Sequence, residues 1–484
     1  MLEKWIELRA RLQPEKTALF QGRTAYSYKD LRERIQKASN YLTTGTSLKK
    51  GDRVAILSQN CATFVDLLFA CSRTGLILVP LNWRLAPEEL KYQVRDAAPS
   101  VLLYSSQFEE TAEAILEDSE TCRKVSLTHY EELLAEAHTL PGEKEGDWED
   151  PVAILYTGGT TGTPKGAVLS QRMILWNAMN TCASWGLSPE DIAPIFTPMF
   201  HTGGLNVLLT PLLSIGGTVV IPDAFDPESA LGIIEDHRCT VVFMIPTMFQ
   251  MMADSPSFKD ADFSSVRFMI AGGAPCPNTL YRTYFEKGVT FIQGYGLTEA
   301  GPNNFAFPHE KARDKVGAIG IPSQYVEIRL EPQGAETGEI WIRGPHVFSH
   351  YWRKPTETGQ VFEDGWLKTG DLASVDEEGF YRIMGRRKEM YISGGENVYP
   401  VEVEYALSLH PSVKEAAVIG VPDSKWGEVG KAYIVARNGN KITGELLCEH
   451  LREKLARYKI PKQWEFREDL PKTPAGKVLK NALK

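Results

Sequence analysis

Residues 156–166 read Tyr156-Thr157-Gly158-Gly159-Thr160-Thr161-Gly162-Thr163-Pro164-Lys165-Gly166, and they directly follow an apolar run from Val152 to Leu155. Glycines let consecutive backbone N–H groups turn inward around an anion without Cβ clashes, while the threonine hydroxyls and Lys165 add donors and positive charge. The stretch therefore predicts a loop that binds a polyphosphate, and the alternative is a flexible surface turn. It is not a Walker A loop, because Pro164 stands where that pattern needs a glycine and no Ser or Thr follows Lys165.

The size and composition of the chain predict several folded units and small-molecule chemistry. A length of 484 residues exceeds what one core holds and suggests about three structural units. The apolar fraction of 43% and the charged fraction of 24% are typical of an ordinary soluble globular protein. The net charge of −9 disfavours a protein that coats nucleic acid or an anionic membrane.

The cysteines indicate a reducing compartment. Seven of them are scattered along the chain, and none pairs with another Cys or a His at the spacing of zinc ligands. The odd count argues against a disulfide framework, so we expect reduced thiols and a cytoplasmic protein. Residues 1–8 contain acidic side chains and no sustained apolar run, so they are not expected to form a signal peptide. No stretch is long and apolar enough to predict an integral membrane segment.

In the middle of the chain, short β-branched or aromatic runs alternate with segments of helical spacing. The predicted strands are residues 218–221, 240–245, 266–270 and 289–292, and the predicted helices include 227–237 and 277–287. This alternation predicts a parallel sheet covered by helices, with ligands outside the carboxyl ends of its strands. The segments at those ends are Pro246-Thr247, Gly272 to Pro275 and Gly294 to Glu299.

The flanking regions complete an α/β fold. Before the loop, strands at 53–57 and 75–80 around a helix near 64–73 predict a second parallel α/β lobe. After Gly338, short alternating strands at 339–343 and 380–384 predict a small β-rich unit. Strands at 416–420 and 431–436 and a helix at 445–456, whose leucines recur at i, i+4 and i+8, predict a small α+β domain. We therefore expect a large N-terminal domain at 1–387 and a small mobile C-terminal domain at 388–484.

Three further segments carry groups suited to nucleotide chemistry. Glu299 ends a glycine-rich turn, and a lone carboxylate among phosphates usually holds magnesium. Asp371 follows a glycine and could accept hydrogen bonds from two ribose hydroxyls. Lys477 could project from a loop restricted by prolines. Each also has a simpler interpretation, namely an ordinary turn for the two carboxylates and a solvated side chain for the lysine.

Taken in order, these segments resemble the adenylate-forming superfamily across essentially the whole chain. That superfamily contains acyl- and aryl-CoA synthetases, amino-acid adenylation domains and firefly-type luciferases. The resembling segments are the phosphate loop, Pro198 to His201 as the gating segment, Gly272 to Pro275 as the adenine-binding stretch, Gly294 to Glu299 as the tyrosine and magnesium motif, Thr369 to Asp371 as the ribose motif, Gly385 to Lys388 as the hinge, and Pro471 to Lys477 as the catalytic-lysine loop.

The resemblance implies a reaction in two steps and a set of site residues. A carboxylate attacks the α-phosphate of ATP to give an acyl-adenylate and pyrophosphate, and the thiol of coenzyme A then displaces AMP, with Mg²⁺ on the phosphates. The implied catalytic residues are Lys477, His201, Thr298 and Glu299, of which Glu299 also binds the metal. The implied ATP-binding residues are Thr157, Gly158, Gly159, Thr160, Thr161, Gly162, Lys165, Gly272, Gly273, Ala274, Pro275, Gly294, Tyr295, Gly296, Thr298, Asp371 and Arg386. The implied hinge is Lys388, and the implied tunnel for coenzyme A is formed by Gly394, Gly395 and Trp426. The implied substrate pocket is lined by Phe200, His201, Phe243, Thr247 and Ala271, with Met244, Asn303 and Asn304 beside them.

An ATP-dependent acid:CoA ligase is the leading functional interpretation. The alternative is a stand-alone enzyme that loads an acyl group onto a carrier-protein pantetheine. Amino-acid adenylation domains resemble one another in having an Asp directly after the gating phenylalanine, whereas this chain has His201 there. This difference argues against an amino acid as the substrate. A luciferase-like oxygenase would use the same adenylate, and a nucleotide-binding regulator would be expected to lack Lys477 or Glu299, which are both present.

The expected acid is fatty or aromatic, because the predicted pocket wall is mostly apolar with little charge. One departure from the family pattern is Gly158, which stands where the phosphate loop usually has Ser and so loses a hydroxyl donor worth ~1 kcal/mol. The expected partners are the acid, ATP and coenzyme A, without nucleic acid, in a monomer or homodimer.

Overall fold

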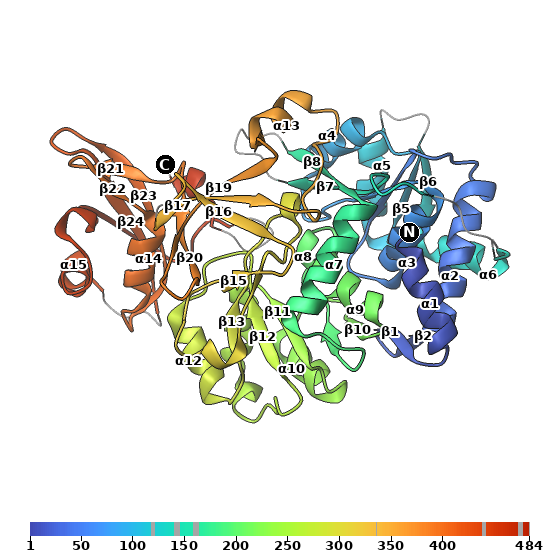
Figure 1. Cartoon of the computed structure of the whole chain (residues 1–484), viewed down its shortest axis with the longest axis horizontal. Coiled ribbons are helices and arrows are strands. Elements are labelled where there is room, and N and C mark those ends of the chain that lie inside the picture. The colour runs from blue at the N-terminus through green and yellow to red at the C-terminus, as the bar shows by residue number, and fades with distance from the viewer. Residues whose placement is uncertain are drawn as a thin grey trace.

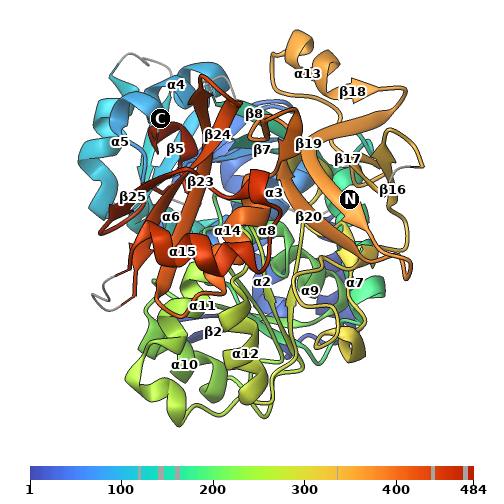
Figure 2. The same ribbon diagram turned by 90° about the vertical axis from the view of Figure 1, so that its left-hand side faces the viewer.

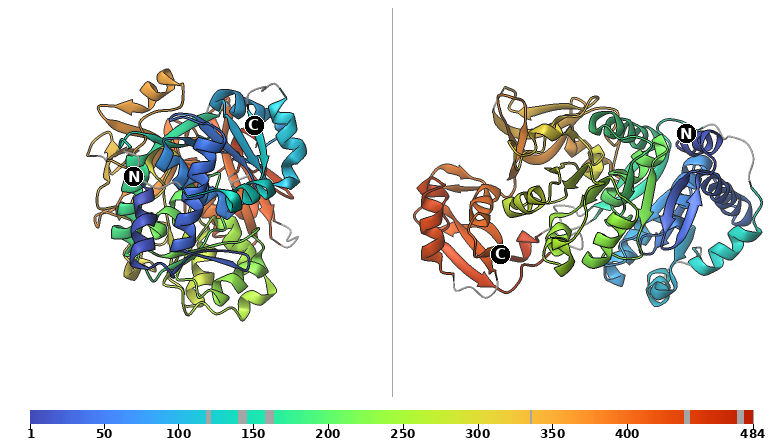
Figure 3. Two further views of the ribbon diagram at one scale, coloured as in Figure 1. Left: turned by 90° about the vertical axis from the view of Figure 1, so that its right-hand side faces the viewer. Right: turned by 90° about the horizontal axis from the view of Figure 1, so that it is seen from below.

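The computed structural model of the chain describes residues 1–117, 122–139, 146–157, 164–334, 336–437, 442–472 and 478–483. Figure 1 shows the described part as an elongated molecule, in which the N-terminus and a small C-terminal unit lie towards opposite ends. The same arrangement is seen from below in Figure 3, where the C-terminal unit stands at one end of the larger body. Within the described ranges, every helix is too short or too polar to cross a bilayer.

The first lobe is built on a mostly parallel sheet with the strand order β6-β5-β3-β4-β7-β8. Strands β3 to β7 run parallel, and β8 returns antiparallel to β7 at the edge of the sheet. Its elements are β3 (Arg53–Leu57), β4 (Ile77–Pro80), β5 (Val101–Tyr104), β6 (Arg123–Ser126), β7 (Pro151–Thr157), β8 (Lys165–Ser170), α2 (Tyr28–Asn40), α3 (Ala62–Thr74), α4 (Pro87–Ala97), α5 (Glu109–Leu116) and α6 (Leu127–Glu136). The parallel lobe predicted ahead of the phosphate loop is confirmed.

Two further sheets form the middle of the molecule, with the orders β2-β1-β10-β9 and β11-β12-β13. Their strands are β1 (Thr17–Gln21), β2 (Thr24–Ser27), β9 (Ile192–Pro194), β10 (Thr218–Ile221), β11 (Val241–Met244), β12 (Phe268–Ala271) and β13 (Phe291–Gln293). The associated helices are α1 (Glu3–Leu12), α7 (Gln171–Trp185), α8 (Thr202–Asn206), α9 (Leu209–Ile215), α10 (Pro227–Asp236), α11 (Pro246–Ala253) and α12 (Asn278–Glu286). The predicted strand 218–221 exists but pairs in parallel with β1 and β9. Local patterns could not reveal this, because β1 comes from the start of the chain.

The remaining elements form the β-rich unit and the C-terminal unit, which faces the viewer in Figure 2. The β-rich unit contains β14 (Phe305–Ala306), β15 (Ile321–Pro322), β16 (Glu327–Glu331), β17 (Thr337–Arg343), α13 (Pro355–Val361), β18 (Phe362–Glu363), β19 (Trp366–Val375) and β20 (Tyr381–Arg386). The C-terminal unit contains β21 (Tyr391–Ser393), β22 (Glu396–Val398), α14 (Pro400–Ser408), β23 (Val413–Asp423), β24 (Gly427–Ala436), α15 (Gly444–Arg452) and β25 (Gln463–Arg467). In α15, Leu447 and Leu451 face the core as predicted, but the helix ends before Leu455, which packs partly buried against the same core.

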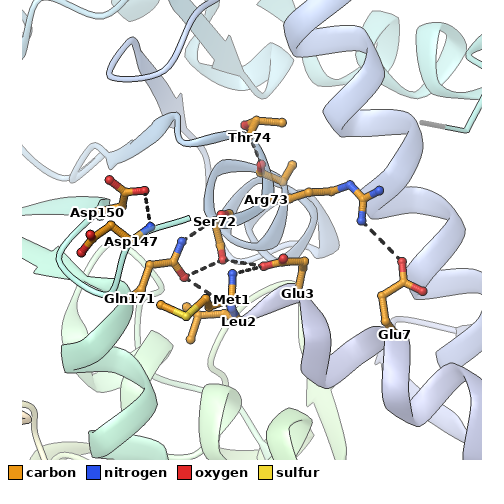
Figure 4. A network of polar contacts seen from close by, with 11 residues as sticks. Met1, Leu2, Glu3, Glu7, Ser72, Arg73, Thr74, Asp147, Asp150 and Gln171 are labelled. Atoms are coloured by element: carbon orange, nitrogen blue, oxygen red, sulfur yellow. Dashed lines mark hydrogen bonds and ion pairs between the residues drawn. The ribbon is translucent and has the colours of Figure 1, made fainter. Parts of the chain in front are cut away.

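A buried polar network fastens α1 and α7 to the fully buried helix α3 (Figure 4). The side-chain amide of Gln171 accepts hydrogen bonds from Ser72 Oγ at 2.8 Å and from the Leu2 backbone at 3.3 Å, and donates to the Ser72 carbonyl at 2.8 Å. Ser72 Oγ also lies 3.2 Å from the Glu3 carboxylate. Because these groups are shielded from water, each bond that is lost leaves an unsatisfied polar atom.

Replacing Gln171 by Leu should therefore destabilise the first lobe by about 2–4 kcal/mol, since the Leu2 N–H and the Ser72 carbonyl both lose a buried partner. The measurement is urea unfolding followed by circular dichroism. Gln360→Leu, the same change on the exposed face of α13, should alter stability by no more than about 0.5 kcal/mol. Equal effects of the two substitutions would contradict this account of the network.

Candidate active site

The predicted phosphate loop connects the antiparallel strands β7 and β8. Thr157 ends β7 and pairs with Lys165, which begins β8. The loop is therefore the connection of a β-hairpin and not the strand-to-helix turn of a Walker A motif. Of its predicted residues, Gly158, Gly159, Thr160, Thr161 and Gly162 lie outside the described part of the chain.

The predicted adenine-binding stretch and the tyrosine motif lie side by side, because they follow the neighbouring parallel strands β12 and β13. Gly294 donates its N–H to the Ala271 carbonyl at 2.9 Å, which joins the two segments. Gly273 has a φ of +80° and is exposed with Pro275, while Ala274 is half-buried. At Gly296 a Cβ atom would come within 2.0 Å of the Pro302 carbonyl oxygen, so only glycine fits there.

Glu299 lies between the phosphate-loop strand and a segment that follows β17. Its Oε1 accepts hydrogen bonds from Tyr351 Oη at 2.8 Å and from Thr157 Oγ1 at 3.4 Å. Among the described residues, none donates a hydrogen bond to its Oε2. Next to it, Thr298 is buried at the start of a 3₁₀ turn. Within the described ranges no group of three or more His, Cys, Asp and Glu side chains could hold a metal ion.

Asp371 and Arg386 face each other across β19 and β20, where they form a ladder pair. Arg386 Nε lies 2.9 Å from one carboxylate oxygen of Asp371, and Tyr295 Oη donates to the other oxygen at 2.7 Å. Burial by itself lowers the pKa of the Arg386 guanidinium, but the Asp371 carboxylate together with Glu389 and Tyr295 more than offsets this and raises it. Burial, reinforced by Asp371, holds the pKa of Tyr295 well above its ordinary value, so the phenol stays protonated and remains a donor.

The gating segment is held by Asn60, which precedes α3. The Asn60 amide donates to the Ile195 and Thr197 carbonyls at 3.0 and 2.9 Å and accepts from the Met199 N–H at 2.8 Å. Phe200 is buried, whereas His201 is exposed at the start of α8. Partial desolvation nevertheless lowers the pKa of the His201 imidazole, which favours the neutral ring.

Phe243, one of the residues predicted to line the substrate pocket, is buried. A Cβ at Gly203 would lie 3.3 Å from the Phe243 ring and a Cβ at Gly272 would lie 2.8 Å from it, so the ring fits between two glycines. Ala271 is buried at the end of β12, and Thr247 is half-buried at the start of α11. Asn303 and Asn304 are instead fully buried and hydrogen-bonded to protein groups.

The residues predicted for the tunnel form a separate group on the C-terminal unit. Gly394 and Gly395 make the two-residue turn between β21 and β22, with φ angles of +64° and +89°. Such a turn itself favours glycine, which is a local reason for the pair besides the passage of a ligand. Gly394 donates to the Trp426 carbonyl at 2.9 Å, whereas a Cβ at Gly395 would meet nothing within 4 Å.

The predicted hinge residue is Lys388 and the predicted catalytic lysine is Lys477. Lys388 is exposed after β20, and desolvation together with the nearby Arg386 charge lowers the pKa of its ammonium group. Lys477 lies outside the described residues. The segments on either side of its loop meet in an antiparallel bridge between Lys472 and Val478.

Three supporting residues were missed by the sequence interpretation. They are Asn60 and Tyr351, described above, and Glu339, whose buried carboxylate accepts from the Gly370 N–H and from Arg387, both at 3.0 Å. Each acts through a partner distant in sequence, so no local motif marks it. The structure thus assembles two polar clusters, one around Glu299 and Thr157 and one around Asp371.

Comparisons with known proteins agree over the whole chain. The family model for AMP-binding enzymes matches residues 6–352, and that for the AMP-binding enzyme C-terminal domain matches residues 402–477. A feruloyl-CoA synthase from Amycolatopsis sp is 40% identical over 489 residues, covering 100% of this chain and 98% of that protein. An indoleacetate–CoA ligase from Aromatoleum aromaticum is 36% identical over 497 residues, covering 100% of this chain and 97% of that protein.

A solved relative has the same fold. The o-succinylbenzoate CoA synthetase from Bacillus subtilis, in complex with its acyl-adenylate intermediate, has a TM-score of 0.88 and 33% identity, covering 99% of this chain and 97% of that chain. The same enzyme was solved with ATP and a magnesium ion, again with a TM-score of 0.88. The resemblance to the adenylate-forming superfamily is confirmed, and the chain belongs to the family of AMP-binding enzymes.

Proposed function

We propose that this protein is an AMP-forming acid:CoA ligase that first makes an acyl-adenylate and then an acyl-CoA thioester. The observation that carries the proposal is the contact of Glu299, at the carboxyl edge of a parallel sheet, with Thr157, the last described residue before the phosphate loop. Relatives that match along their whole length are CoA synthases and ligases. ATP and coenzyme A are therefore its co-substrates.

In the first half-reaction, the acid carboxylate attacks the α-phosphate of ATP and pyrophosphate leaves. Lys477 would lie between carboxylate and phosphate, where its ammonium group offsets the negative charge that develops. Asp371 would accept hydrogen bonds from the ribose hydroxyls, and Tyr295 would flank the adenine. In the second half-reaction, the thiol of coenzyme A attacks the acyl carbon and AMP leaves.

The described residues fit one magnesium ion. Mg²⁺ keeps several waters and is usually bound by one or two carboxylates together with substrate phosphates. One oxygen of Glu299 accepts a hydrogen bond from Tyr351, whereas Oε2 accepts none from the described residues, so Oε2 is the atom that would bind the ion. When bound, the ion would neutralise phosphate charge on the leaving pyrophosphate.

The substrate class that we propose is an aromatic carboxylic acid, with a fatty acid as the second choice. Phe243 packs against Gly203 and Gly272 within a mostly apolar set of predicted pocket residues, and an apolar wall of this kind suits an aryl group. Two relatives are named for aryl-substituted acids, ferulate and indoleacetate. The test is AMP formation with ferulate, indoleacetate, benzoate and dodecanoate, and selective turnover of dodecanoate would reverse the order of choice.

We also propose a cytoplasmic monomer or homodimer that acts on small molecules. All seven cysteines are free thiols in the structure, as expected for a reducing compartment. Coenzyme A is preferred over a carrier protein as the acceptor. A comparison of free coenzyme A with a pantetheine-bearing carrier protein as acceptor, after adenylate formation, tests that choice.

Lys477→Ala should slow acyl-adenylate formation by orders of magnitude but largely preserve thioester formation from a supplied acyl-adenylate. The reason is that the ammonium group acts on the charge of the first transition state alone. The two half-reactions are measured separately, with Lys414→Ala, an exposed lysine of β23, as the control. Equal losses in both half-reactions would refute this division.

Gly395→Leu should slow thioester formation while pyrophosphate exchange continues, because a bulky side chain would block the proposed path of the thiol. Adenylate should then accumulate. Gly379→Leu controls for backbone strain, since Gly379 has a φ of +82° and equally open surroundings in another turn. A parallel fall of pyrophosphate exchange in the Gly395 variant would remove the tunnel assignment.

Glu299→Gln should raise the magnesium concentration needed for the first half-reaction, because one charged oxygen ligand is neutralised. Asp371→Ala should instead weaken ATP binding at every magnesium concentration, since ribose contacts do not involve the metal. Magnesium titrations at fixed ATP distinguish the two. An Asp371 defect that excess magnesium rescues, or a Glu299 defect indifferent to magnesium, would show that the roles are misassigned.

A further inference from the structure

The segment from Phe348 to Trp352 lies along β8, the strand that follows the phosphate loop. Trp352 donates its N–H to the Gly166 carbonyl at 2.7 Å, and the Val168 N–H donates to the His350 carbonyl at 3.2 Å. Tyr351 forms an antiparallel bridge with Ala167 between these two bonds. The segment thus behaves as a short extra strand beside β8.

The same segment holds Glu299 at two points. The Phe348 N–H donates to the Glu299 backbone carbonyl at 2.8 Å, and Tyr351 Oη donates to Oε1 of its side chain, also at 2.8 Å. The Tyr351 side chain has little freedom, because only 7% of the residue is exposed and its ring packs edge-on against Phe348 at 4.9 Å. The direction of the Glu299 carboxylate is therefore set by a rigid phenol.

The face of the same ring carries a cation. Lys165 Nζ lies 5.2 Å from the centroid of the Tyr351 ring, within the range of a cation–π contact. One side chain therefore contacts both the predicted metal ligand and the predicted phosphate-loop lysine.

We propose that Tyr351 is a positioning residue for the first half-reaction, with its hydroxyl turning Glu299 Oε2 towards the metal and its ring holding the Lys165 ammonium beside it. This inference rests on the proposed function, because it gives Glu299 and Lys165 their roles with magnesium and phosphate. The hydrogen bond to a carboxylate is of the stronger kind. Loss of this bond should change the magnesium dependence of ATP binding more than it changes the stability of the fold.

The test is binding of a fluorescent ATP analogue to Tyr351→Phe during a magnesium titration, with no acid present and hence no turnover. Removing the hydroxyl alone should raise the magnesium concentration at half-saturation by roughly three- to tenfold, and the difference should vanish at saturating magnesium. An unchanged midpoint would overturn the proposal.

The matched control is Tyr284→Phe, which also removes a buried hydroxyl, one that donates to the Phe249 carbonyl at 2.9 Å in the core of the middle lobe. It should lower thermal stability about as much as Tyr351→Phe and leave the magnesium midpoint unchanged. A shift of the magnesium midpoint in this control equal to that of Tyr351→Phe would overturn the proposal, since it would show a general effect of destabilisation.

Glu299→Gln and the double variant separate this inference from the proposed function. If Glu299→Gln shifts the magnesium midpoint and Tyr351→Phe does not, the positioning role alone fails. If Glu299→Gln causes no shift either, the metal assignment in the proposed function fails with it. A double variant no worse than Glu299→Gln supports action of Tyr351 through Glu299, whereas fully additive shifts would overturn it.

Discussion

Parallel pairing of β11, β12 and β13 is the constraint on which the site depends, because it places the carboxyl ends of these strands at one edge. The segments that follow them converge there although they are dozens of residues apart in sequence. These segments approach one another so closely that backbone atoms are in contact, as at Gly296, where no Cβ fits beside Pro302. The strand β7 contributes Thr157 to the same place, so Glu299 meets the phosphate-loop hairpin without any sequence proximity.

The sequence allowed prediction of those features that local patterns encode. Apolar runs of four or five residues correctly marked β3, β10 and β12, and the glycine-rich segments after the strands predicted the ligand edge. It could not predict that β10 pairs with β1, since a strand's partners are chosen by packing over long sequence distances. The roles of Tyr351 and Glu339 could not be predicted either, because a single Tyr or Glu outside a motif indicates no function until its partner in the fold is known. The tested part of the prediction is the family and fold, and the roles of the site residues remain predictions.

The Asp371 cluster shows how a carboxylate can be both fixed and available. Each oxygen of Asp371 already accepts one hydrogen bond, from Arg386 or from Tyr295. A carboxylate has about four acceptor positions, so two remain, as the proposed contact with two ribose hydroxyls requires. The partners therefore hold the carboxylate in place before any ligand binds, and they do not compete with the ligand for all of its lone pairs.

Several residues that sequence motifs identify are exposed, whereas two of the side chains that support them are buried. His201, Gly273, Pro275 and Gly296 are exposed, although other motif residues, such as Thr298 and Asp371, are buried. Tyr351 and Glu339, which hold their neighbours in place, are buried. A buried polar side chain is costly unless every bond is made, so its geometry is tightly determined and can determine the geometry of an exposed partner. Buried side chains can therefore hold motif residues in place through hydrogen bonds such as that from Tyr351 to Glu299.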